Sequence, residues 1–193
     1  MDRGRMSQSL KVRIPIERVG VLIGPKGSVK THIEKKCKVK LWIDSDTGEV
    51  EISPTSEIED PSFLLKAQNI VLAVGRGFSS EKALKLLDDE YLLEIFDLRG
   101  FIGRSRKNLM RVKGRIIGER GKTRRIIEEA TGADISIYGH TIAIIGKHDE
   151  ILVAREAVQR LISGSEHSAV YRLLGKRKHE LKKERLKLWE PTI

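Results

Sequence analysis

The chain has 193 residues, of which 39% are hydrophobic and 33% are charged, and its net charge is +10. This length suits one large or two small globular domains. Apolar runs are shorter than the roughly 18–20 residues of a membrane span, and residues 1–11 lack the apolar core of a secretory signal. One cysteine, Cys37, excludes an internal disulfide and fits a reducing cytoplasm. The basic excess predicts a polyanionic partner and no membrane partner.

The first part of the chain contains the pattern of one small domain at 10–77, after a disordered start at 1–9. Alternating apolar and polar residues predict strands at 10–16, 38–43 and 49–53. Helices are predicted at 17–23, 28–36 and 60–74. Ser28 and Asp60 can cap the last two of these helices. The resulting order is β-α-α-β-β-α.

The second part repeats this order at 91–164, after a linker at 78–90 that contains a short helix. Strands are predicted at 91–97, 133–138 and 141–145, and a long helix at 149–162. About twenty residues separate the first strand from the glycine turn that follows, against about eight in the first domain. A basic helical insertion at 104–113 is expected to fill this space. Residues 165–193 form a basic tail, part of which is predicted to be helical.

A short glycine motif occurs in both domains. Gly24 and Gly27 flank Pro25 and Lys26, and 94 residues later the same spacing recurs. The second copy comprises Gly118, Glu119, Arg120 and Gly121, and the apolar residues after it stay in step with those of the first copy. One such motif is weak evidence because it is common by chance. Two copies with matching flanks are a strong signal.

Basic residues gather around the second glycine motif. Between residues 99 and 125 there are eleven basic side chains, and the acid among them is Glu119. They are Arg99, Arg104, Arg106, Lys107, Arg111, Lys113, Arg115, Arg120, Lys122, Arg124 and Arg125. A polyanion is therefore expected to bind near this motif.

The run from Ile116 through Gly118 and Gly121 to Ile127 resembles the core of a KH domain. The resemblance implies an α+β fold of two tandem type I KH domains, followed by the basic helical tail. It also implies that each G-x-x-G turn holds the backbone of about four nucleotides of single-stranded RNA. Because aromatic residues make up only 5% of the chain, stacking platforms of the RRM kind are not expected.

The resemblance assigns an RNA-binding surface to each domain, with the second expected to be the main one. In it, Arg120 is expected to contact phosphate, and aliphatic side chains are expected to pack against bases. The second-domain residues are Arg115, Ile117, Gly118, Glu119, Arg120, Gly121, Lys122, Thr123, Arg124, Arg125, Ile135 and Ile137. Those of the first domain are Gly24, Pro25, Lys26, Gly27, Ser28, Lys30 and Lys40. Glu119, Pro25 and Asp134 depart from the residues common in the family.

No catalytic, metal or cofactor site is expected. Gly121-Lys122-Thr123 looks like the end of a Walker A loop, but Ile116 stands where that loop needs glycine. The five histidines are dispersed and lack the spacing of metal ligands.

The second half, from Gly114 to Tyr171, is similar to one particular family in more detail. Segments that carry the similarity are 114–124, 128–131, 144–146, 154–158 and 161–165. The family is the two-KH small-subunit ribosome-assembly factor of archaea and eukaryotes, and the intact first loop points to an archaeal member. The resemblance implies binding near the 3′ end of small-subunit ribosomal RNA and partnership with a PIN-domain endonuclease and other assembly or translation proteins. Two alternatives are an adaptor of an RNA-degradation complex and a scaffold that does not bind RNA.

Overall fold

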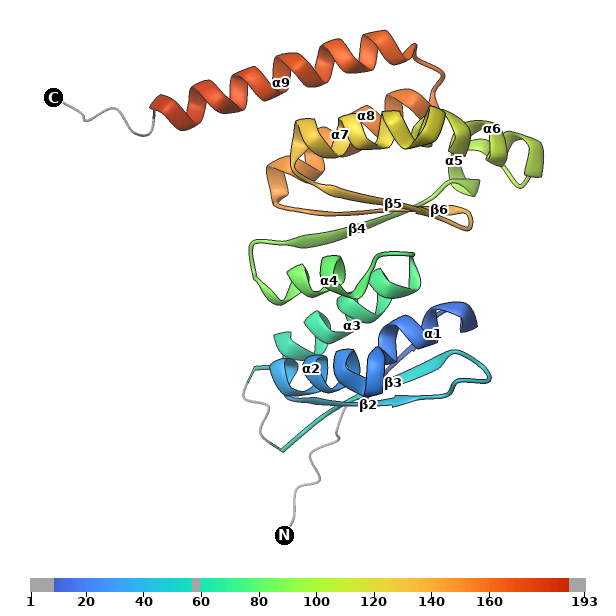
Figure 1. Ribbon diagram of the computed structural model, residues 1–193, viewed down its shortest axis with the longest axis vertical. Coiled ribbons are helices and arrows are strands. Elements are labelled where there is room, and N and C mark those ends of the chain that lie inside the picture. Colours follow the sequence, from blue (N-terminus) through green and yellow to red (C-terminus); the bar gives the residue numbers. More distant parts are fainter. Residues whose placement is uncertain (1–8, 57–59, 188–193) are drawn as a thin grey trace, which may run out of the picture. The chain divides into compact units, whose positions relative to one another are not determined.

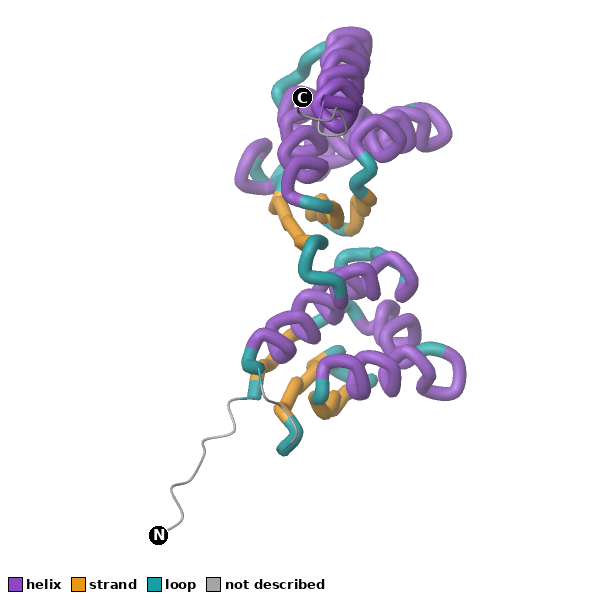
Figure 2. Tube along the Cα trace, turned by 90° about the vertical axis from the view of Figure 1, so that its left-hand side faces the viewer, coloured by secondary structure: helices purple, strands orange, loops and turns teal. Residues whose placement is uncertain are grey.

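The computed structural model describes residues 9–56 and 60–187 (Figure 1). The chain divides into two compact units, Met1–Leu93 and Glu94–Ile193. In each unit helices lie over one side of a three-stranded sheet, as Figure 2 shows. The predicted α+β class is confirmed. Most of the predicted disordered start, and the end of the tail, lie outside the described residues.

The first unit contains an antiparallel sheet with strand order β1-β3-β2. Its elements are β1 (Leu10–Arg13), α1 (Ile16–Ile23), η1 (Pro25–Gly27), α2 (Ser28–Cys37), β2 (Val39–Ile43), β3 (Glu49–Pro54), α3 (Ser62–Gly75), α4 (Ser80–Ala83) and η2 (Leu84–Leu87). Alternate strand residues such as Val12, Leu41 and Ile52 are buried against the helices. This one-sided burial is why the sequence alternates between apolar and polar residues.

The segment predicted as a linker, 78–90, packs within the first unit. Its helices α4 and η2 lie against α3. The Lys66 ammonium on α3 joins them, because it donates a hydrogen bond to the Leu87 carbonyl at 3.3 Å and pairs with Asp89 at 2.6 Å. These contacts give residues 78–90 fixed positions on the first unit.

The second unit has strand order β4-β6-β5. Its elements are β4 (Leu92–Asp97), α5 (Arg99–Ile102), α6 (Arg106–Ile117), η3 (Glu119–Gly121), α7 (Lys122–Thr131), β5 (Asp134–Tyr138), β6 (Thr141–Gly146), α8 (His148–Ile162) and α9 (His167–Lys187). The predicted basic insertion is no separate helix. It is the N-terminal part of α6, which has 12 residues where α1 has 8 and continues without a break to Gly118.

The start of the basic tail belongs to the core of the second unit. Helix α9 packs against α7 and α8, and its Val170 and Leu174 are buried in the same cluster as Ile116 and Ile127. The predicted helical tail is therefore confirmed for its described part. Its packing means that the second unit needs more chain than the six elements of the repeated pattern.

Two further features concern α2. Cys37 is buried at its end, where it packs as a small core residue, and burial raises the pKa of its thiol to about 11. The prediction that Ser28 caps this helix is wrong. Ser28 is already the first residue of α2, the capping position is Gly27, and no side chain there accepts a hydrogen bond. Within the described residues, no helix is long and apolar enough to cross a membrane.

Candidate nucleic-acid interface

The two glycine turns adopt nearly the same backbone conformation. In the second turn, φ and ψ are 73° and 175° at Gly118, 49° and 30° at Arg120, and 78° and 12° at Gly121. The matching angles in the first turn are 72° and 174°, 51° and 29°, and 76° and 13°. Glu119 in one copy and Pro25 in the other therefore leave the turn unchanged. The motif specifies the backbone, whatever residue fills its second position.

The first glycine of each turn is required by the fold. A Cβ atom on Gly118 would lie 2.7 Å from both the backbone nitrogen and the Cβ atom of Thr123. A Cβ atom on Gly24 would likewise lie 2.9 Å from both the backbone nitrogen and the Cβ atom of Val29. The φ and ψ of Gly118 also lie in a region that is essentially open only to glycine. This residue lets the chain turn sharply from α6 into α7.

The second glycine has no such neighbour. A Cβ atom on Gly121 or Gly27 would meet nothing within 4 Å. Each residue is left-handed and occupies the N-cap position of the following helix, where no side chain caps the free N–H groups. Uncapped N–H groups and the helix dipole together favour an anion at this place.

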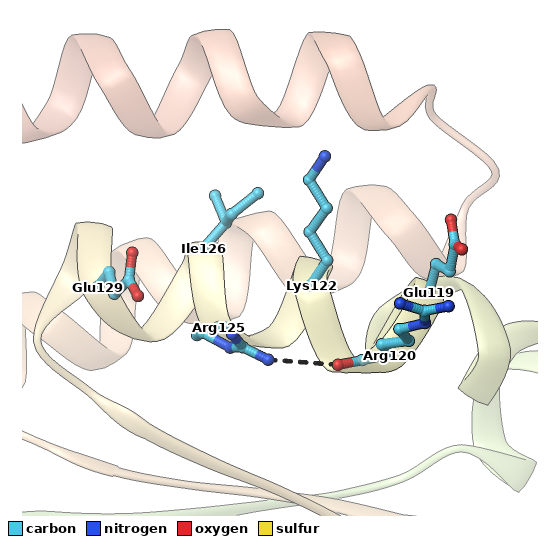
Figure 3. Close-up of a pocket in the computed structure, with 6 residues that line it drawn as sticks. All are labelled: Glu119, Arg120, Lys122, Arg125, Ile126 and Glu129. Atoms are coloured by element: carbon cyan, nitrogen blue, oxygen red, sulfur yellow. Dashed lines mark hydrogen bonds between the residues drawn. The ribbon is translucent and has the colours of Figure 1, made fainter.

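Cations surround the second turn on several sides. In Figure 3 the side chains of Lys122 and Ile126 point from α7 toward α9, and those of Arg125 and Arg120 lie below them in this view; all four line one hollow. The Arg125 guanidinium donates a hydrogen bond to the Arg120 carbonyl at 3.3 Å, which ties the helix to the turn. The side chain of Arg124 lies 3.5 Å from Glu128, beside strand β5. A phosphate chain passing over the turn can therefore meet a cation on each side.

Two adjoining hollows lie at this turn. One, of about 390 Å³, is lined by Glu119, Arg120, Lys122, Arg125, Ile126 and Glu129 (Figure 3). The other, of about 420 Å³, is lined by Arg111, Gly114, Arg115, Gly118, Glu119, Lys122, Thr123, His167 and Tyr171. Lys122 and Glu119 border both, so the hollows form one continuous surface around the turn.

Three residues that the sequence assigned to RNA contact have other roles in the structure. Thr123 is buried, and its hydroxyl group lies 2.9 Å from the Tyr171 hydroxyl, so it supports the turn from below. Ile135 is 2% exposed and belongs to the core. The Arg115 guanidinium donates to the carbonyls of Leu161, near the end of α8, and Ser165, just beyond it, and so holds this segment against α6. These contacts give the three residues a part in the fold, and their assignment to RNA contact stays a prediction.

The remaining predicted residues lie at or near the surface. Glu119, Arg120, Lys122, Arg124 and Arg125 are exposed, while Ile117 and Ile137 are half-buried at the edge of the core. In the first unit Pro25, Lys26, Ser28 and Lys40 are exposed, and Lys30 is half-buried. Trp42, two residues beyond Lys40 on β2, has 59% of its surface exposed and was not among the sequence candidates.

Two repeated features near the turns were also missed. Glu34 accepts a hydrogen bond from the Leu41 backbone N–H, and Glu128 accepts one from Ile135, each at 2.9 Å. In both units this carboxylate joins the second helix to the edge strand of the sheet. The two glutamates lie 94 residues apart, so the offset between the glycine turns would have located them.

The second repeated feature is a glycine one helical turn before each glycine turn. Gly20 and Gly114 lie inside α1 and α6, are exposed, and have open space where a Cβ atom would stand. Glycine inside a helix destabilises it by about 1 kcal/mol relative to alanine. No internal packing explains either residue, and Gly114 lines the hollow that contains Gly118. Within the described residues, no group of three acidic, histidine or cysteine side chains is placed to hold a metal.

This architecture defines a protein with two type I KH domains. The family model for the eukaryotic-type KH domain (type I) matches residues 92–179, and that of the Krr1 first KH domain matches residues 18–89. A KH domain-containing protein of Methanocaldococcus jannaschii is 48% identical over 179 residues, covering 93% of this chain and 78% of that protein. The RNA-binding protein pno1 of Dictyostelium discoideum is 31% identical over 165 residues, which cover 85% of this chain and 69% of that protein.

Two solved structures from Pyrococcus horikoshii are similar throughout. Dim2p is 51% identical with a TM-score of 0.82, covering 88% of this chain and 99% of that chain. The second is an a/eIF2alpha–aDim2p–rRNA complex, in which the matched chain is 50% identical with a TM-score of 0.85 and coverages of 92% and 97%. The chain belongs to the Dim2/PNO1 family of pre-rRNA-processing KH proteins, as its sequence resemblance indicated.

The two glycines of the second turn should differ in their effect on stability. Gly118→Ala is expected to lower the free energy of unfolding by about 2–4 kcal/mol, because it adds both a clash and a disallowed conformation. Gly121→Ala should lower the free energy of unfolding by only about 1 kcal/mol, because the left-handed conformation is the one penalty that it adds. Urea unfolding followed by circular dichroism measures both, with Gly24→Ala and Gly27→Ala as the matched pair in the first unit. Equal losses at the two positions would contradict the assignment.

Proposed function

We propose that this protein binds single-stranded RNA near the 3′ end of small-subunit ribosomal RNA and acts there in ribosome assembly without catalysing a reaction. RNA binding is the function that the surface around the second turn supports best. The P. horikoshii relative is named in a complex with rRNA, and other relatives are named pre-rRNA-processing proteins. The proposal extends these properties to this chain.

The observation that carries the proposal is the open side of Gly121. No Cβ atom obstructs it, the first N–H groups of α7 begin there, and Arg120 and Lys122 stand on either side. Phosphate oxygens can approach the backbone closely at such a place and accept hydrogen bonds from it. Because these contacts involve phosphate, they hold the strand without reading its sequence.

Sequence would be read where α7 faces strand β5. Glu128 is fixed by its hydrogen bond to the Ile135 N–H, and it holds Arg124 within 3.5 Å. An arginine beside a carboxylate presents a donor and an acceptor together, which can pair with a base edge. Ile117 and Ile137, half-buried nearby, would supply the apolar surface on which a base packs.

The second unit is proposed as the main RNA contact. Its turn has Arg120, Lys122, Arg124 and Arg125, whereas the matching positions of the first unit are Lys26, Ser28, Lys30 and Thr31. The fall from four cations to two lowers the number of phosphates that can be neutralised, and affinity falls with it. The first unit would add a weaker contact through Lys26 and Lys40.

The partners other than RNA follow from the family and from the proposed position on the RNA. A protein held near the 3′ end can position or restrain the PIN-domain endonuclease that matures it. The P. horikoshii complex also contains a/eIF2alpha, which makes a translation protein a second candidate partner. An adaptor of RNA degradation would bind RNA with no preference for this region, and a scaffold would not bind RNA at all.

Gly121→Asp tests the site directly. A carboxylate at this open position repels phosphate. Its Cβ atom would meet nothing within 4 Å, so the left-handed conformation costs about 1 kcal/mol and the fold should persist. We expect binding to a 3′-end ribosomal RNA of about 12 nucleotides to fall by about tenfold or more, as measured by fluorescence anisotropy. Gly27→Asp, the matched variant, should cost about threefold or less.

A scrambled RNA of the same composition separates the alternatives. Weaker binding to the scrambled RNA supports the ribosomal assignment, and equal binding favours the degradation adaptor. Absence of binding by folded wild-type protein would leave the scaffold. A Gly121→Asp variant that is folded and binds as tightly as wild type would overturn the proposed site.

Gly114→Ala should change stability and binding in opposite directions. Alanine favours the helix by about 1 kcal/mol, so the thermal midpoint of the second unit should rise. The added methyl group stands on the surface proposed to face the RNA, so affinity should fall severalfold. Differential scanning calorimetry and anisotropy on the same sample give both values. A rise in stability with unchanged affinity would show that the RNA does not approach this face.

A further inference from the structure

The N-terminal part of α6 has a set of cations that the fold does not use. Three other cations of this region have structural partners: Arg99 pairs with Asp97, Lys113 donates to the Gly139 carbonyl, and Arg115 donates to the end of α8. Four remain, all exposed, and their side chains contact no other described residue through an ion pair or hydrogen bond. They are Arg104, Arg106, Lys107 and Arg111.

These charges oppose the stability of the helix that carries them. Arg106 and Lys107 occupy the first turn of α6, where the helix dipole disfavours positive charge, and that turn has no acidic residue. Lys107 and Arg111 are four residues apart and repel each other across one turn. A solvated helix face usually mixes both signs of charge, so this single-sign arrangement is unfavourable unless an anion binds to it.

The cations lead directly to the glycine turn. Positions 107, 111 and 114 follow one another at helical spacing on one face of α6, and Gly118 is the C-cap residue that follows. Arg111, Gly114 and Gly118 line the same hollow, which shows that the face continues into the turn. From Lys107 to Gly118 the helix rises by about 16 Å, a distance that a strand at duplex spacing covers in about five nucleotides.

Exposed apolar side chains accompany the cations. Met110 on α6 has 66% of its surface exposed, and Phe101 on α5 has 54%. Cations that bind the backbone, together with flat or flexible apolar side chains that contact bases, are the combination found where proteins bind single strands. The first unit has no counterpart, because α1 is four residues shorter and begins at Ile16.

We infer that the exposed face of α5 and α6 is a second RNA contact, which binds the segment of the same strand that flanks the nucleotides at the second glycine turn. The occupant is the continuation of one RNA chain, because the face is uniformly positive and continuous with the turn. This inference rests on the proposed function and adds to it the length of RNA that the second unit holds. It predicts that affinity depends on RNA length beyond the roughly four nucleotides that a KH turn holds.

A length series with the double variant Arg106→Glu/Lys107→Glu tests the inference, because both residues are exposed on α6 and neither lines the hollows at the turn. A short 3′-end RNA of about six nucleotides occupies the turn alone, and one of about 14 nucleotides reaches α6. The variant should bind the short RNA within about twofold of wild type and the long RNA at least about tenfold more weakly. Its slope of log affinity against log salt on the long RNA should be smaller by about two.

The controls separate this site from general charge effects. Lys35→Glu/Lys36→Glu makes the same charge change on the exposed end of α2 and should leave both RNAs bound as before. Glutamate at position 107 favours the helix dipole, so the double variant should keep its thermal midpoint. Equal weakening on both RNA lengths, or no weakening on the long RNA, would overturn the inference. Failure of the wild-type protein to bind even the short RNA would instead contradict the proposed function, namely RNA binding at the second glycine turn.

Discussion

The second unit depends on the sharp passage from α6 to α7 at Gly118. Any side chain there would collide with Thr123, whose hydroxyl group lies 2.9 Å from that of Tyr171 on α9. The turn is thus supported from below by residues separated by almost 50 positions in sequence. Because this support fixes the backbone, the free N–H groups of α7 are held in place before RNA arrives, and binding need not bear the cost of ordering them.

Because of this constraint, neighbouring glycines and cations of the turn have different roles. Gly118 is required by the fold, whereas Gly121 leaves space above the first N–H groups of α7, although the G-x-x-G motif does not distinguish them. Likewise, Arg115 clamps the end of α8 while Arg120 and Lys122 remain exposed on the turn. Charge in the sequence indicates where a polyanion binds. The carbonyls and carboxylates that each cation meets decide which of them are available.

The sequence predicted the elements of both units well, because one-sided burial imposes a period on every strand and helix. It could not separate Ile135, which lies in the core, from Ile137, which is half-buried two residues along the same strand. Nor could it show that Thr123 is buried, since that depends on α9 packing over α7. The repeat offset of 94 residues would also have paired Glu34 with Glu128 and Gly20 with Gly114. These residues are acidic or glycine, unlike the basic and aliphatic residues expected to contact RNA.

The central claim is that RNA lies over the open side of the second turn. Amide chemical shifts during titration with 3′-end ribosomal RNA test it most directly. The account predicts the largest changes at Gly121, Lys122 and the following amides of α7, with smaller changes at Gly27 and its neighbours. Saturating RNA that leaves the amides of Gly118–Arg125 unmoved, while shifts appear elsewhere, would contradict it.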